Sequence, residues 1–294
     1  MKKPKIFFSK KKLLLESAKA LQNPRASVKK GLPKIFFDPE NFEAYGKIFS
    51  NVVVVDSHTH IGYDKDGHSI DGKRFIKNMD LAQVNMAIVF PLNEPLVRNF
   101  SRQNDKVFDF YRKHPNRIIP FFRLNPKSKW KSEYEKRVLQ GFRGIKLHPR
   151  SQDFGIASEH AMGIYERAEN NRLPVIIHTG FGLDNVADDA KKVVGTFPKL
   201  RLILGHSAFV DLENTIKAVG KNENVLFETS TLGIVDLLHL LNSVDYTKIA
   251  FGSDVPYYDF DIALEMLVDT AIICNKNPNH IKAILGGNIL KWFK

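Results

Sequence analysis

The residue types best suited to chemistry are two histidines spaced by one residue, His58 and His60, which follow the apolar run Val52–Val55. In an extended strand alternate side chains share a face, so both imidazoles would lie on one side, with α-carbons about 6–7 Å apart. Both rings could then reach one cation. Such a pair alone fits equally well with histidines that are hydrogen-bonded inside a core. The other polar residues must therefore decide whether a metal site exists.

The apolar run before the histidines indicates how they are placed. Four consecutive β-branched residues cannot alternate between a wet and a dry face, so Val52–Val55 predicts a strand buried on both sides. Strands of this kind occur in parallel sheets that are covered by helices. The two histidines then follow the carboxyl end of the strand, where open α/β sheets and (β/α)8 barrels place their chemistry.

From residue 52 onward, short apolar runs alternate with longer stretches of helical periodicity. Eight strands are predicted, at 52–56, 86–90, 118–122, 144–147, 175–178, 202–205, 225–228 and 249–252. Helices are predicted between and after them, at 74–81, 97–113, 130–139, 161–170, 188–197, 211–219, 235–241 and 262–273. The fold class is therefore α/β, and eight βα units predict a (β/α)8 TIM barrel. A doubly wound open sheet is the alternative, but it does not bring all strand ends to one mouth.

Potential ligands recur at the ends of these predicted strands. They are His58 and His60 after the first strand, Lys146 and His148 at the fourth, His178 at the fifth, His206 at the sixth and Asp254 at the eighth. Five of the ten histidines of the chain are in this set. Scattered core histidines would not show this pattern, so it favours a metal site.

Five sequence motifs resemble those of the amidohydrolase superfamily. They are Asp56-Ser57-His58-Thr59-His60, Gly144-Ile145-Lys146-Leu147-His148-Pro149, Pro174-Val175-Ile176-Ile177-His178-Thr179-Gly180, Leu204-Gly205-His206 and Phe251-Gly252-Ser253-Asp254. The resemblance covers about residues 52–290 and is closest to the amidohydrolase-related branch. That branch includes hydrolases and nonoxidative decarboxylases similar to aminocarboxymuconate-semialdehyde decarboxylase.

The resemblance implies one divalent metal, usually Zn²⁺, which would be held by His58, His60, His178 and Asp254. It also places His206 beside the water that the metal activates. Neutral imidazoles and one carboxylate are ligands that suit zinc, and an open coordination position lets the ion acidify water. Asp254 could accept the proton, and His206 could orient the nucleophile or the reacting carbonyl.

Lys146 and its neighbours leave several roles open. In branches of the superfamily with two metals, a lysine at this strand is carbamylated and bridges both ions, whereas an ordinary ammonium would bind a substrate anion. Lys146, His148 and Arg150 occupy alternate positions, so an extended backbone would direct all three toward one carboxylate-binding mouth. Pro149 could instead break the alternation and turn Arg150 outward. Glu228 could equally support the ligands or take part in catalysis.

The net charge of +12 is concentrated at the N-terminus. Residues 1–50 contain 12 of the 44 Lys/Arg and only 4 of the 32 Asp/Glu, which predicts a basic, partly helical extension before a barrel over 51–294. The extension could pack on the barrel or on a second subunit of a homo-oligomer. A single cysteine, Cys274, and the lack of a run of about 18–20 apolar residues favour a cytoplasmic protein without a membrane span.

These features favour a metal-dependent hydrolase that uses an activated water on an amide, ester or lactone of a small anionic substrate. A metal-dependent nonoxidative decarboxylase or hydratase could use the same residues and is the alternative. A nuclease similar to the TatD type is disfavoured, because that type has a glutamate ligand around the fourth strand, where this chain has Lys146 and His148. The small excess of positive charge beyond residue 50 also argues against nucleic acid as a partner.

Overall fold

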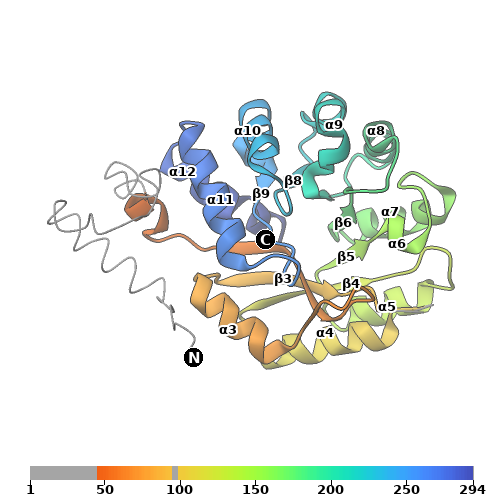
Figure 1. The fold of residues 1–294 in the computed structure, drawn as a ribbon. Coiled ribbons are helices and arrows are strands. Elements are labelled where there is room, and N and C mark those ends of the chain that lie inside the picture. Colours follow the sequence, from red (N-terminus) through yellow and green to blue (C-terminus); the bar gives the residue numbers. More distant parts are fainter. Residues whose placement is uncertain (1–44, 95–98, 294) are drawn as a thin grey trace, which may run out of the picture.

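The computed structural model describes residues 45–94 and 99–293 of the 294-residue chain. Its framework is a curled sheet with the strand order β2-β1-β3-β4-β5-β6-β7-β8-β9, and helices surround the strands (Figure 1). Only the short strand β2 is antiparallel to its neighbour β1. The expected α/β class with eight parallel strands is therefore present.

The parallel strands are β1 (Val55–Tyr63), β3 (Met86–Pro91), β4 (Ile118–Arg123), β5 (Gly144–Leu147), β6 (Val175–His178), β7 (Leu202–Gly205), β8 (Val225–Glu228) and β9 (Ile249–Ala250), and β2 is Ser69–Ile70. The longer helices are α3 (Gly72–Ala82), α4 (Ser101–Lys113), α5 (Lys131–Leu139), α7 (Glu159–Asn170), α8 (Val186–Thr196), α9 (Leu212–Val219), α10 (Ile234–Ser243) and α11 (Phe260–Ile273). Short helical segments are α6 (Pro149–Gln152), η2 (His206–Asp211), η3 (Tyr246–Lys248), α12 (Pro278–Lys282), η4 (Ala283–Gly287), α13 (Asn288–Leu290) and η5 (Lys291–Phe293).

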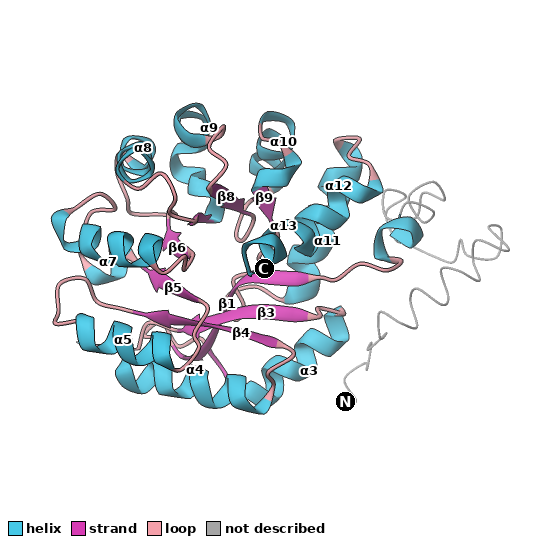
Figure 2. Ribbon diagram, turned by 180° about the vertical axis from the view of Figure 1, so that it is seen from behind, coloured by secondary structure: helices cyan, strands magenta, loops and turns pink. Residues whose placement is uncertain are grey.

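Hydrogen bonds between β1 and the segment after β9 bring the two ends of the sheet together. The amide of Ser57 donates to the carbonyl of Phe251, and the amide of Asp254 donates to the carbonyl of His58, each at 2.8 Å. Asp56 supports the same junction, because its Oδ1 accepts from the amides of His58 and Ser253 at 3.0 and 3.1 Å. The parallel strands therefore form a closed ring, visible from the other side in Figure 2.

Two apolar clusters form the core, one inside the ring of strands and one between the strands and the helices. The inner cluster consists of Val55, Ile88, Phe90, Ile119, Phe121, Ile176, Ile203, Leu226, Ala250 and Ile289. The larger outer cluster contains the alternate strand residues, such as Val175, Ile177, Leu202 and Leu204, together with the apolar faces of the helices. Because side chains alternate along a strand, each inward residue is followed two positions later by another inward residue near the carboxyl end. For Ile176 that residue is His178, and for Leu226 it is Glu228.

The prediction for the first strand was wrong in its bounds. The strand begins only at Val55, which pairs with Met86, and it continues through both histidines to Tyr63. Val53 is 47% exposed, so the valine run is not buried on both sides. Valines 52–54 lie outside the ladder because the neighbouring strand β3 begins at Met86.

A break in the register of β1 decides where the two histidines point. Val55 faces the interior, so strict alternation would direct residues 57 and 59 inward and His58 and His60 outward. The pairing with β3 shifts between Asp56 and Thr59, which inserts one residue and reverses the alternation. This bulge places both imidazoles in the interior of the ring. No pattern in the sequence indicates that a bulge occurs here.

The predicted basic extension lies mostly outside the described residues, so the division between 1–50 and 51–294 stays a prediction. No helix in the described parts of the chain is long and apolar enough to cross a membrane.

The close packing inside the ring gives a stability prediction at Gly144. A Cβ at this position would overlap the Phe121 ring, so Gly144→Ala should lower the free energy of unfolding by about 1–3 kcal/mol through overpacking. Urea denaturation monitored by circular dichroism measures the change. Gly195→Ala is the matched control, because a Cβ there meets no atom within 4 Å and α8 would gain helix propensity. Equal stability changes in the two variants would contradict the packing argument.

Candidate metal centre

A cavity of about 670 Å³ opens at the carboxyl ends of the parallel strands. All eight residues that the sequence singled out contribute to its wall: His58, His60, Lys146, His148, Arg150, His178, His206 and, as the acidic member, Asp254. Other lining residues include Asp64, Asn93, Arg123, Ser151, Phe181, Phe209 and Tyr257. The closed ring thus brings residues from five separate strands, or from the loops that follow them, to one place.

Two histidines of β1 and one aspartate converge within this cavity. Asp254 Oδ1 lies 3.3 Å from His58 Nε2 and 3.0 Å from His60 Nε2. The three residues are buried and form a group whose ligand atoms all lie within 4.8 Å of one another. Four ligands bound tetrahedrally to zinc at about 2.0–2.1 Å are separated by about 3.3 Å. The observed separations therefore fit a shared divalent ion.

The protonation states of these residues also fit a metal. Burial lowers the pKa of His60 and holds the pKa of His58 well below its usual range, so both rings are neutral and have a lone pair to offer. Burial alone would raise the pKa of Asp254, but the hydrogen bond from His60 and nearby cationic groups lower it. The ring nitrogen His178 Nε2 is buried without a hydrogen-bond partner in the described structure. Unpaired buried nitrogens of this kind are expected where an ion would complete the site.

Glu228, at the end of β8, fixes the orientation of His58. Its Oε2 lies 2.6 Å from His58 Nδ1, which leaves His58 Nε2 directed toward Asp254. The same oxygen accepts from the amide of His206 at 3.1 Å and from Ser230 Oγ at 2.8 Å, and Oε1 accepts from the amide of Ser230. Burial raises the pKa of Glu228 to about 8. Glu228 therefore positions the histidines, as a carboxylate behind a metal-binding imidazole does.

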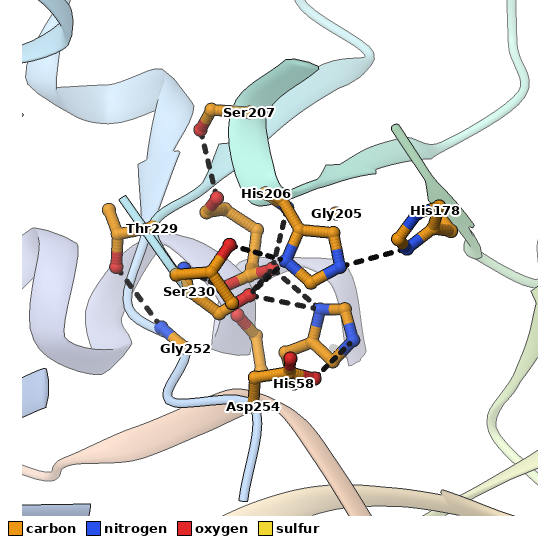
Figure 3. Close-up of polar contacts among 12 residues, drawn as sticks. His58, His178, Gly205, His206, Ser207, Thr229, Ser230, Gly252 and Asp254 are labelled. Atoms are coloured by element: carbon orange, nitrogen blue, oxygen red, sulfur yellow. Dashed lines mark hydrogen bonds and ion pairs between the residues drawn. The ribbon is translucent and has the colours of Figure 1, made fainter. Parts of the chain in front are cut away.

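His206 lies beside His58, with ring centres 4.7 Å apart, and contacts His178 (Figure 3). Its Nε2 is 3.0 Å from His178 Nδ1, while its Nδ1 is within 2.8 Å of Ser230 Oγ and 3.1 Å of Thr231 Oγ1. His178 therefore faces His206 rather than the other three predicted ligands, and its role as a ligand stays a prediction. Burial lowers the pKa of His206 to about 4.

The backbone is strained where the chain places two of these side chains. His206 and Asp254 both have positive φ values, of 67° and 68°. For residues other than glycine this left-handed conformation is unfavourable, and it occurs often at functional sites. Hydrogen bonds from the amide of His206 to Glu228 and from the amide of Asp254 to His58 hold it in place.

Lys146 is fully buried and lines the same cavity. Its Nζ lies 3.1 Å from His58 Nε2 and 4.7 Å from the centre of the Phe90 ring. Burial lowers the pKa of Lys146 to about 7, although Asp254 and Glu228 act in the opposite direction.

A second possible metal group, His58 with His206 and Glu228, consists of residues already hydrogen-bonded to one another.

His148 and Arg150 line the cavity, but the predicted alternation from Lys146 to Arg150 is wrong. The strand ends at Leu147, His148 is the N-cap of α6, and Pro149 begins that helix, so Arg150 projects from a helical turn. The His148 ring stacks on His178 with a centroid separation of 3.9 Å. Arg150 is exposed, and its side chain lies over Gly182, where a Cβ added to the glycine would be 2.8 Å from Arg150 Cδ.

Two further buried residues, Asp56 and Arg123, have roles near the cavity that the sequence analysis did not assign. Asp56 joins β1 to the segment after β9, and burial raises its pKa to about 7. Arg123 is the last residue of β4, two positions after the inward-facing Phe121, and lines the cavity. A signal was present for Arg123, because it directly follows the predicted strand 118–122.

Comparisons with known proteins agree with this architecture. The family model described as Amidohydrolase matches residues 55–294, so the chain belongs to this family. A search of curated proteins found no match.

Several solved structures share the fold at low sequence identity. An uncharacterised TIM-barrel protein from Bordetella bronchiseptica has a TM-score of 0.66 and 16% identity, over 82% of this chain and 98% of that one. A 5-carboxyvanillate decarboxylase from Novosphingobium aromaticivorans, complexed with manganese and 4-hydroxy-3-methoxy-5-nitrobenzoic acid, has a TM-score of 0.65 and 16% identity over 83% and 96%. A probable 2-pyrone-4,6-dicarboxylic acid hydrolase from Acinetobacter baumannii with bound citric acid has a TM-score of 0.58 and 12% identity over 82% and 98%. These likenesses establish the TIM-barrel fold.

The contacts of Glu228 predict how its replacement affects metal binding. Glu228→Gln replaces one of the two carboxyl oxygens that hold His58 and the amides of His206 and Ser230 with an NH2 group, so the affinity for Zn²⁺ should fall about ten- to a hundredfold. Competition with a chromophoric chelator measures the affinity. Glu223→Gln is the control, since its side chain is 93% exposed and pairs only with Lys248 among the described residues. Unchanged affinity in Glu228→Gln would show that this carboxylate does not support the metal centre.

Proposed function

We propose that this protein is a metal-dependent hydrolase that acts on an amide, ester or lactone of a small anionic molecule. The observation that carries the proposal is the ionised Asp254 carboxylate within 3.3 Å of two neutral imidazoles in a buried cavity. The metal is proposed to be a single Zn²⁺ held by His58, His60 and Asp254, with His178 as the fourth residue. Two nitrogens and a carboxylate oxygen suit zinc, and manganese is the competing ion because a similar solved structure contains it.

The residues around the ion would transfer the proton and orient the substrate. A bound divalent ion supplies a water that ionises near neutral pH and a Lewis acid for a carbonyl oxygen. Asp254 is ionised and can accept the proton from the attacking water. His206, whose Nδ1 is held by Ser230 and Thr231, directs Nε2 into the cavity region near His178 and can orient the reacting carbonyl. The cavity volume of about 670 Å³ suits a small molecule.

A nonoxidative decarboxylase is the second candidate. Support for it comes from the solved structures with the same fold, which include decarboxylases for 5-carboxyvanillate and 2,6-dihydroxybenzoate. The same ligands would hold the metal, and the substrate would again be a carboxylate. Release of CO2, as opposed to a product that has gained water, separates the two reactions in a screen of lactones, esters and aromatic carboxylates.

Removal of a single proposed ligand tests the metal assignment. His60→Ala and Asp254→Asn should each weaken divalent-metal binding by at least about a hundredfold, because both atoms would coordinate the ion directly. Elemental analysis of protein purified without chelators, followed by titration with Zn²⁺ and Mn²⁺, measures stoichiometry and affinity. His239→Ala, an exposed histidine on α10, is the control. Wild-type metal content in both ligand variants would refute the site.

A variant of His206 separates chemistry from metal binding. His206→Asn should retain most of the metal but lower turnover by about 10²–10⁴-fold, the range expected when a group acting on the reacting atoms is lost. Steady-state kinetics with the substrate found in the screen, together with metal analysis of the same sample, provides the measurement. Normal turnover would exclude His206 from the reaction.

A further inference from the structure

Arg123 is a buried cation whose hydrogen-bond partners are all neutral. Its side chain is 0% exposed, and it donates to Ser151 Oγ at 2.7 Å and, at 3.4 Å each, to Asn93 Oδ1 and the carbonyl of Pro91. Arg123 Nε has no partner in the described structure. A buried guanidinium is costly unless an anion compensates its charge, so this environment is incomplete.

Arg137 shows what a buried structural arginine looks like in the same protein. It is also 0% exposed, but its Nε lies 2.5 Å from Glu133 Oε1 and its Nη1 lies 2.6 Å from Asp105 Oδ1. It also donates to the carbonyl of Ser101 at 2.7 Å. The charge and donors of Arg137 are therefore satisfied by the protein, in contrast to those of Arg123.

The charged and titratable groups around Arg123 do not include a carboxylate paired with it among the described residues. Arg123 is the register partner of Lys146 on the adjacent strand, and both side chains are fully buried. Asp64 favours the charged form of Arg123 electrostatically, but no ion pair joins them among the described residues, and Asp64 accepts from the amides of Asp66 and Asn93. Arg123, which has no paired carboxylate among the described residues and lies beside Lys146 and a proposed divalent metal, therefore needs further negative charge.

The guanidinium is held in one orientation at the wall of the cavity, and a ligand would reach it by displacing its neutral partners. The Phe100 ring covers one of its faces, with Cζ 4.6 Å from the ring centre. Asn93 and Ser151, its half-buried partners, also line the cavity, and the 3.4 Å contact with Asn93 is long. A carboxylate in the cavity could replace these neutral acceptors and pair with the planar donor through two hydrogen bonds.

We propose that Arg123 is the anchor for a carboxylate group of the substrate in the cavity, a role for which the sequence analysis considered Lys146, His148 and Arg150. This inference rests on the proposed function for the reacting end of the substrate. It defines the substrate class as small carboxylates that carry one acid group toward Arg123 and present another bond to the proposed metal.

Carboxylate binding to metal-loaded protein tests the assignment. The probes are 4-hydroxy-3-methoxy-5-nitrobenzoate, its methyl ester and citrate, and calorimetry gives their dissociation constants for wild type, Arg123→Met, Arg123→Lys and Arg150→Met. At least one carboxylate should bind wild type and bind Arg123→Met about ten- to a hundredfold more weakly, with a smaller loss for Arg123→Lys. The methyl ester should not discriminate between the proteins. Arg150→Met should change the affinity less than Arg123→Met.

Thermal unfolding in the absence of ligand supplies a second measurement. Arg123→Met should melt at or above the wild-type temperature, because an uncompensated buried charge is removed, whereas Arg137→Met should melt lower. The inference is overturned if no probe binds wild type better than Arg123→Met, or if Arg150→Met causes the larger loss. If Arg123→Met does not fold, unchanged carboxylate affinity in Arg123→Lys overturns it.

Metal analysis of the same samples keeps the two proposals separate. A protein that binds carboxylates through Arg123 but holds no divalent metal would refute the proposed hydrolase and leave the role of Arg123 standing. A protein that holds the metal but shows no effect of Arg123 on carboxylate affinity would refute the role of Arg123 and leave the proposed hydrolase standing.

Discussion

The carboxylate of Glu228 connects the parts of the barrel on which the candidate site depends. It joins β8 to β1 through His58 Nδ1 and to the start of η2 through the amide of His206. Gly252 leaves room for it, because a Cβ at that position would collide with its Oε1. One buried acid therefore determines which nitrogen of His58 faces Asp254 and how the strained backbone at His206 is held.

Burial determines the charge of this region as much as the residue types do. It lowers the pKa of all five cavity histidines and brings the pKa of Lys146 to about 7, while it raises the pKa of Asp56 and Glu228 to about 7 and 8. Asp254 stays ionised because its pKa is lowered, and Arg123 stays charged with a pKa of about 10. A divalent ion would add positive charge that the protein does not balance, which is why an anionic substrate is consistent with the whole cavity.

Much of the framework followed from the sequence, because apolar runs and their spacing specify buried strands. The bounds of β5, β6, β7 and β8 agree with the predicted ranges 144–147, 175–178, 202–205 and 225–228. The first strand was misplaced because a β-branched run shows a propensity for strand but not where a neighbouring strand can pair with it. The alternation from Lys146 to Arg150 was wrong because Pro149 begins a helix, which was the alternative that the sequence left open.

The sequence by itself determined the α/β class, the recurring βα unit and the set of histidines and aspartate that could hold a metal, since these depend on residue type and local periodicity. Only the tertiary structure decided which of them meet. The bulge in β1 turned His58 and His60 inward, and ring closure brought Asp254 to them from nearly 200 positions away. The tertiary structure also buries Arg123 without an ion-pair partner among the described residues. Burial and partnership are properties of contacts between distant segments, so no local pattern could specify them.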